Sequence, residues 1–150
     1  MKEELTRRDE MSLAGAALRG APWKKAAITG GGAAAISVVL GFIGGEPDVS
    51  WALCLGVSLF AIVAAVGAVS RPDLGDRVTR QARVWSLRHP WRFSLYPGVG
   101  AAVLMYPVQL VFDHEGVFGA ALDALWGGAL VYLAAGLITF AIRGRAANAR

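Results

Sequence analysis

Charged residues are missing from four long stretches of this 150-residue chain. Residues 26–44, 51–69, 93–112 and 124–142 contain no Asp, Glu, Lys or Arg, and each has about the length that a helix needs to cross a bilayer. With 55% hydrophobic residues and a mean hydropathy of +0.49, the chain is too apolar for an ordinary soluble domain of this size. The sequence therefore predicts an all-α integral membrane protein with four transmembrane helices packed as a four-helix bundle.

Cysteine and catalytic motifs are almost absent. Cys54 is the only cysteine, which excludes an internal disulfide and indicates a small buried hydrophobic side chain inside the second span. No P-loop, nucleophile-elbow or zinc-protease pattern occurs, so no cofactor is implied and an enzyme is not the favoured interpretation. The first apolar stretch begins only at residue 26 and is long enough to span, so we expect no cleaved signal peptide.

Basic residues are absent from two of the three connections between the apolar stretches. The 15 Lys and Arg residues instead precede the first span, separate the second from the third, or follow the fourth. Because Lys and Arg beside spans are retained in the cytoplasm, we expect both termini and the central connection to be cytoplasmic. The abundance of Arg, Ala and Gly over Lys is typical of GC-rich bacterial genes, so the membrane expected is a bacterial inner membrane.

The overall charge is basic, with a net charge of +4 and a pI of about 9.7. The basic residues flank the spans, and no recognised nucleic-acid motif accompanies them, so nucleic acid is not an expected partner. Attraction to the anionic lipids of the bilayer accounts for this charge at about 1 kcal/mol for each Lys or Arg near the surface.

One short phrase occurs twice, at the start of the first span and at the start of the third. An offset of 68 residues matches a proline, a tryptophan, a cation and two glycines in the two copies. The pairs are Pro22 with Pro90, Trp23 with Trp91, Lys24 with Arg92, Gly30 with Gly98 and Gly32 with Gly100. Beyond the next connection, an offset of about 72 matches Gly56 with Gly128 and Phe60 with Tyr132.

This duplication predicts the domain organisation. A unit of two spans returns the chain to its starting side, so consecutive units share one orientation and are parallel repeats. We therefore expect a single membrane domain over residues 1–150, with repeat one at about 1–70 and repeat two at about 71–150. Each repeat consists of a cytoplasmic amphipathic segment followed by a helical hairpin.

Residues 5–19 and 76–88 are the two amphipathic segments. In the second segment Val78, Ala82 and Trp85 share one helical face, and most of the arginines lie on the other. Such a segment rests on lipid as an interfacial helix, or docks a cytoplasmic or membrane protein partner, or is disordered. Because indole favours the headgroup region, Trp23, Trp85 and Trp91 are predicted membrane-interface anchors.

Glycine and proline interrupt the first and third spans at corresponding places. These residues are Gly30, Gly31 and Gly32 in the first span and Pro97, Gly98 and Gly100 in the third. Paired interruptions of this kind mark a ligand or ion pathway in transporters, because broken helices expose backbone dipoles. Small residues also let helices pack closely, and few polar side chains accompany them here. Both interpretations stay open, and we expect self-association to complete the packing of so small a bundle.

Few ionisable side chains remain as candidates for a site. Asp123 adjoins the fourth span and is either part of a ligand or ion pathway or a carboxylate at the outer interface. Asp113, His114 and Glu115 carry donor atoms that suit a metal. Because consecutive side chains diverge, these three residues are weak candidates, and no metal site is predicted.

Three classes of function are consistent with these features. The leading hypothesis is an oligomeric transport or pore-forming protein, based on the parallel repeats and the paired interruptions. The alternative is a non-catalytic accessory or scaffold subunit of a larger membrane complex, based on the scarcity of polar residues in the spans. A membrane enzyme acting at the outer face through the acidic residues is a distant third.

Overall fold

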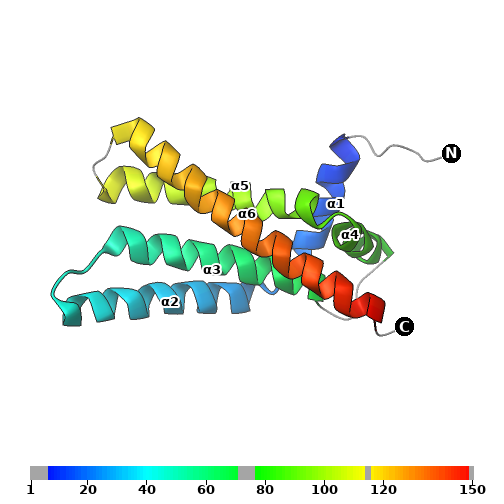
Figure 1. Ribbon diagram of the computed structural model, residues 1–150, viewed down its shortest axis with the longest axis horizontal. Coiled ribbons are helices and arrows are strands. Elements are labelled where there is room, and N and C mark those ends of the chain that lie inside the picture. The colour runs from blue at the N-terminus through cyan, green and yellow to red at the C-terminus, as the bar shows by residue number, and fades with distance from the viewer. Residues whose placement is uncertain (1–6, 71–76, 114–115, 149–150) are drawn as a thin grey trace.

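The computed structural model describes residues 7–70, 77–113 and 116–148, and this part of the chain is helical apart from short connections. Its helices are α1 (Arg7–Arg19), α2 (Trp23–Gly44), α3 (Val49–Ser70), α4 (Arg77–Arg88), α5 (Pro90–Phe112) and α6 (Gly116–Asn148), as Figure 1 shows. Among the described residues, α2, α3, α5 and residues 116–145 of α6 are long and apolar enough to span a membrane. The predicted all-α membrane fold with four spans is confirmed.

The ends of the long helices follow from local chemistry. Pro90 occupies the first turn of α5, where its missing N–H costs nothing. α2 ends at Gly45, whose φ of 88° is the left-handed conformation that glycine adopts without strain. Asp48 caps α3, because its carboxylate accepts the N–H of Trp51 at 2.8 Å. The fourth span differs from its predicted range of 124–142, because nothing from residue 116 onward stops the helix and α6 begins there.

The spans form two hairpins that point the same way. The α2–α3 and α5–α6 connections lie at one end of the molecule, whereas α1, α4 and both ends of the described chain lie at the other (Figure 1). α2 and α5 therefore run in the same direction, as predicted for parallel repeats. The end with the two hairpin connections is the acidic end, and the other, basic end carries most of the Lys and Arg residues.

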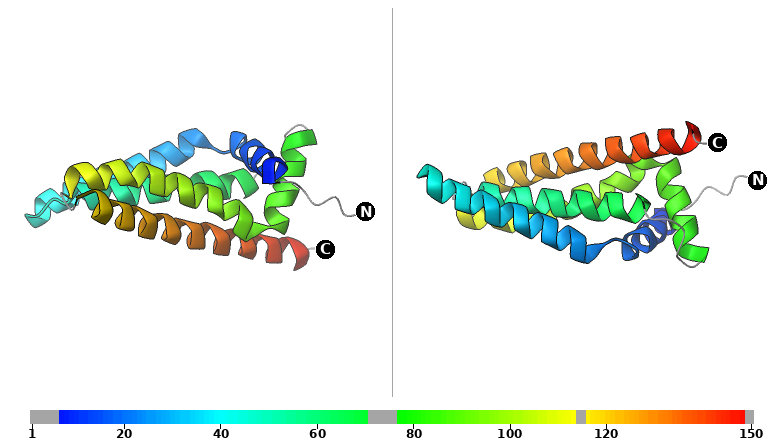
Figure 2. Two further views of the ribbon diagram at one scale, coloured as in Figure 1. Left: turned by 90° about the horizontal axis from the view of Figure 1, so that it is seen from above. Right: turned by 90° about the horizontal axis from the view of Figure 1, so that it is seen from below.

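α3 is the central helix of the bundle. It packs against α2 in its own hairpin and against both α5 and α6 of the other. By contrast, α2 packs on α3 alone among the spans in the described part of the chain, and α2 and α6 lie on opposite sides of α3 (Figure 2). Large apolar side chains such as Ile28, Ile43 and Phe118 are more than 70% exposed, as in a bundle whose outer surface contacts lipid tails.

The amphipathic helices α1 and α4 pack on each other and on the basic end of the bundle. Their apolar residues Ala14, Ala17, Ala82 and Trp85 are buried in one cluster with Val69 at the end of α3. The guanidinium Nε of Arg83 donates to the carbonyl of Val69 at 2.7 Å, and Arg92 forms an ion pair with Glu10 of α1. The face that could rest on lipid is therefore largely covered by protein, although Val78 on the same predicted face remains 55% exposed.

Candidate functional site

In the first hairpin, the backbones of α2 and α3 touch at a glycine pair. A Cβ atom placed on Gly30 would lie 2.5 Å from the carbonyl oxygen of Gly56 and 2.8 Å from the Cβ of Phe60. A Cβ placed on Gly56 would lie 2.8 Å from the Gly30 carbonyl oxygen and 2.9 Å from the Cβ of Ala34. Any side chain at either position would push α2 and α3 apart, so the backbones touch here because both residues are glycine.

The second hairpin repeats this contact with the corresponding residues. A Cβ placed on Gly98 would lie 2.8 Å from the Cβ of Tyr132 and 3.0 Å from the Gly128 carbonyl oxygen. A Cβ placed on Gly128 would lie 2.7 Å from both the Gly98 carbonyl oxygen and the Cβ of Ala102. The offsets of 68 and about 72 thus match residues that make the same contacts.

An aromatic pair accompanies each glycine contact toward the basic end. The rings of Trp23 and Phe60 have centroids 5.9 Å apart, and those of Trp91 and Tyr132 have centroids 5.8 Å apart. Trp23 and Trp91 are 45% and 41% exposed, which leaves part of each indole free to contact headgroups. Trp85 differs, because it is only 6% exposed and its ring packs beside His89, so it holds α4 on the bundle.

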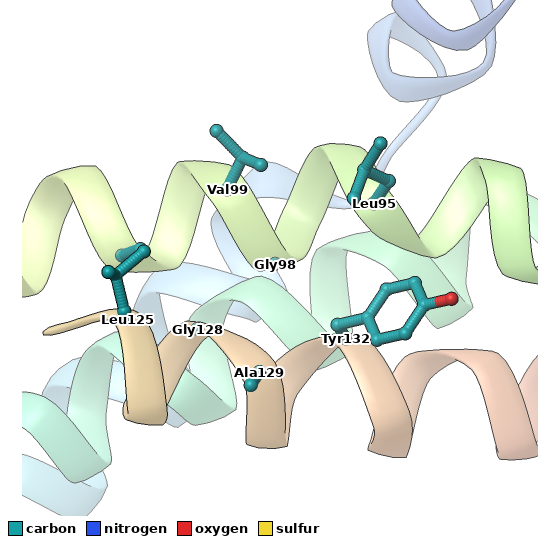
Figure 3. A pocket seen from close by; sticks show the side chains of 8 residues that line it. Leu95, Gly98, Val99, Leu125, Gly128, Ala129 and Tyr132 are labelled. Carbon is teal, nitrogen blue, oxygen red and sulfur yellow. The ribbon is translucent and has the colours of Figure 1, made fainter. Parts of the chain in front are cut away.

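Each glycine contact lies in a shallow apolar groove between the two helices of its hairpin. The groove of the second hairpin is shown in Figure 3 and has a volume of about 220 Å³; that of the first has about 230 Å³. Residues at equivalent repeat positions line the two grooves. They are Gly30, Gly31, Ala34, Leu53, Gly56, Val57 and Phe60 in one, and Gly98, Val99, Ala102, Leu125, Gly128, Ala129 and Tyr132, with Leu95, in the other.

The predicted interruptions do not break the helices. α2 continues through Gly30, Gly31 and Gly32, and α5 continues through Pro97, Gly98 and Gly100. Gly30 and Gly98 serve close packing, whereas a Cβ on Gly31, Gly32 or Gly100 would meet nothing within 4 Å. Participation of these residues in a ligand or ion pathway stays a prediction.

Polar and acidic side chains gather at the acidic end, which holds the two hairpin connections. The Ser50 hydroxyl, at the start of α3, donates to the carboxylate of Asp113 at 2.7 Å and joins the two hairpins. A cavity of about 470 Å³ beside this bond is lined by Glu46, Asp48 and Asp113, among others. Asp123 is exposed, one to two turns into α6. Within the described residues no three metal-binding side chains converge, and the metal candidates His114 and Glu115 lie outside that part.

Two buried side-chain oxygens inside the spans have no hydrogen-bond partner in the described structure. They are Oγ1 of Thr139, which is fully buried, and Oε1 of Gln109, which is 9% exposed. Ser94 differs, because its hydroxyl donates to the carbonyl of Pro90 at 2.7 Å. Gln109 lies one turn before Asp113, so it extends the polar side chains of the acidic end into the bundle.

Sequence reasoning found some of these residues and missed others. The glycines and aromatics of the hairpin contacts were visible because the repeat offsets pair them. The bond between Ser50 and Asp113 was missed, since a serine and an aspartate 63 positions apart carry no local signal. Comparison with protein-family models, curated proteins and solved structures finds no match to this chain.

Proposed function

We propose that this chain is the subunit of an oligomeric membrane protein that passes ions or small solutes across a bacterial inner membrane. The observation that carries the proposal is the polarity of the bundle's two ends. An acidic cavity at the outer end faces away from a basic end formed by α1, α4 and the terminus of α6. Charged rings of this kind at pore mouths concentrate and select ions.

The path itself runs between copies of the chain in this proposal. The grooves along both hairpins have apolar linings, so they offer no hydrogen-bonding route for an ion within one copy. The incompletely packed helix α2 supports association, because it contacts one neighbouring span and leaves much apolar surface uncovered. The excess of Lys and Arg at the end that holds α1 and α4 supports a cytoplasmic location for that end.

The alternative is an accessory or scaffold subunit of a larger membrane complex. Its supporting observation is that the buried polar groups of the spans are few: Ser50, Ser94, Gln109 and Thr139 in the described residues of the spans. In that case the open face of α2 would receive another membrane protein.

Flux through liposomes separates the two functions. Purified protein reconstituted in liposomes of anionic and zwitterionic phospholipid should release trapped K⁺ or Na⁺ faster than protein-free liposomes. Asp113→Asn should reduce that cation flux, because it removes charge from the outer cavity, while the control Glu3→Gln in the amino-terminal segment should not. Liposomes with correctly inserted wild-type protein that stay as tight as the protein-free ones would reject transport and favour the accessory subunit.

A further inference from the structure

The two hairpins contact each other asymmetrically. If a two-fold axis related the two hairpins, every contact between a helix of the first hairpin and a helix of the second would occur twice, the second time between the repeat-equivalent helices. α3 packs on α4, α5 and α6, but the corresponding helix α6 makes no comparable contact with α1 or α2 in the described residues. Figure 2 shows the consequence, since α2 and α6 form the two outer flanks of the bundle. The interface between the repeats is therefore head to tail: two different surfaces meet, and this contact occurs once within a chain.

The equivalent surface of the second repeat is exposed. α3 meets the second hairpin through one helical face that includes Ser50, Cys54, Val57 and Ala61, and the buried Ala65 continues the same face by one turn. An offset of 72 converts these into Leu122, Trp126, Ala129, Leu133 and Leu137 of α6. The four large members of this α6 face are 69%, 69%, 47% and 58% exposed, in that order.

The sizes of the side chains are exchanged between the two repeats. Inside one chain, the small Ala61 of α3 shares a cluster with the larger Met105 of α5. At the repeat-equivalent positions α6 carries the large Leu133 and α2 carries the small Ser37. At an interface between α6 of one copy and α2 of another, Leu133 and Ser37 would fill about the same total volume as Ala61 and Met105 do inside one chain. The large side chain would come from the other partner.

We propose that the exposed face of α6 docks on α2 of a second copy of this chain. The geometry is that of the internal contact between α3 and α5, repeated between copies, so assembly is head to tail. Each copy then has one α6 face and one α2 face for its two neighbours. The copies form a closed ring when the rotation from one copy to the next is a whole-number fraction of a full turn. This inference rests on the self-association in the proposed function and assigns that association its surfaces.

The internal contact also fixes the register. Ala61 and Ala101 belong to one buried cluster, and the bond between Ser50 and Asp113 aligns the outer ends of α3 and α5. Their repeat equivalents are Leu133 on α6 and Ala33 on α2. These two residues are expected to face each other across the interface between copies, near the middle of the membrane.

Cysteine crosslinking in native membranes tests this arrangement. In a Cys54→Ala background, the pair Leu133→Cys and Ala33→Cys should give a ladder of crosslinked species beyond the dimer on mild oxidation. Each single variant should stay uncrosslinked, because a head-to-tail interface does not bring the same residue of two copies together. In the matched control, Ala35→Cys takes the place of Ala33→Cys. Ala35 lies at a similar depth in α2 but on a different side of the helix, where it is exposed.

Several results would overturn the proposal. Absence of any ladder from the Leu133 and Ala33 pair, dimers from either single variant, or equal crosslinking of the Ala35 control would each exclude this interface. As a second measurement, Leu133→Ala with Leu137→Ala should shift the native assembly to monomer, while Val103→Ala should not, and an unchanged assembly would contradict the proposal. A ladder from membranes whose purified protein shows no liposome flux would reject transport and leave the assembly established.

Discussion

At the residue scale, contact between the backbones of paired helices depends on particular glycines rather than on every glycine in the spans. Gly30 touches Gly56, and Gly98 touches Gly128, with backbone carbonyls at the contact. Their neighbours Gly31 and Gly100 border open space. Because lipid supplies no hydrophobic drive between helices, such backbone contact is a main source of hairpin stability.

Gly30→Ala should therefore lower the stability of the first hairpin by about 1–3 kcal/mol, since the added methyl must displace the Gly56 carbonyl. The measurement is unfolding of detergent-solubilised protein by increasing SDS, followed by circular dichroism. Gly98→Ala should behave alike, because Tyr132 and Gly128 crowd it in the same way.

Gly31→Ala is the matched control, one residue away in the same helix. It should leave the unfolding midpoint unchanged or slightly raised, since alanine favours a helix over glycine and meets nothing within 4 Å. Equal loss of stability in the Gly30 and Gly31 variants would contradict the packing account of the glycine pairs.

At the scale of whole helices, Trp85 is the largest buried side chain that α4 packs on the bundle. Its indole is 6% exposed within a cluster that also contains residues of α1 and α3. The side chain of Arg83 also donates a hydrogen bond to the Val69 carbonyl. The ion pair of Arg92 with Glu10 contributes little, because the Arg92 side chain is 64% exposed.

Trp85→Ala should release α4 from the bundle, at a local cost of about 3–5 kcal/mol for the lost buried ring. Trypsin should then cleave the arginine-rich α4 many times faster in proteoliposomes that present this end outward, while the spans stay protected by lipid. Val84→Ala, whose side chain is 43% exposed, should not change the cleavage rate. Unaltered cleavage of the Trp85 variant would show that other contacts hold the helix.

The spans were predictable because membranes exclude charge over a fixed length, and residues 26–44 and 51–69 show that gap directly. The surface on which α1 and α4 pack was not predictable. An apolar stripe of Ala82 and Trp85 suits a lipid surface and a protein surface equally, and only the folded structure shows that α1 and α3 cover it. The helices that pack on α3 were not predictable either, because the sequence of a helix that is apolar all round does not indicate which face contacts which neighbour.

At the scale of the whole molecule, two similar hairpins are arranged with one direction and one asymmetric interface. The glycine contacts and aromatic pairs recur in both halves, so the hairpin is the repeated unit. The contact of α3 with α5 has no comparable counterpart between α6 and α2 in the described residues, so a single copy leaves α2 and α6 open. Both the proposed function and the proposed assembly depend on the hairpins sharing one orientation in the membrane.

Labelling of single cysteines in intact cells tests that orientation most directly. The cysteines are placed in a Cys54→Ala background, and an impermeant thiol reagent is added from outside. Asp48→Cys and Glu115→Cys, in the connections of the two hairpins, should both be labelled. Ser12→Cys, Thr79→Cys and Ala147→Cys should react only after the membrane is opened. Labelling of Thr79→Cys from outside, or of only one of the two hairpin connections, would contradict the parallel arrangement.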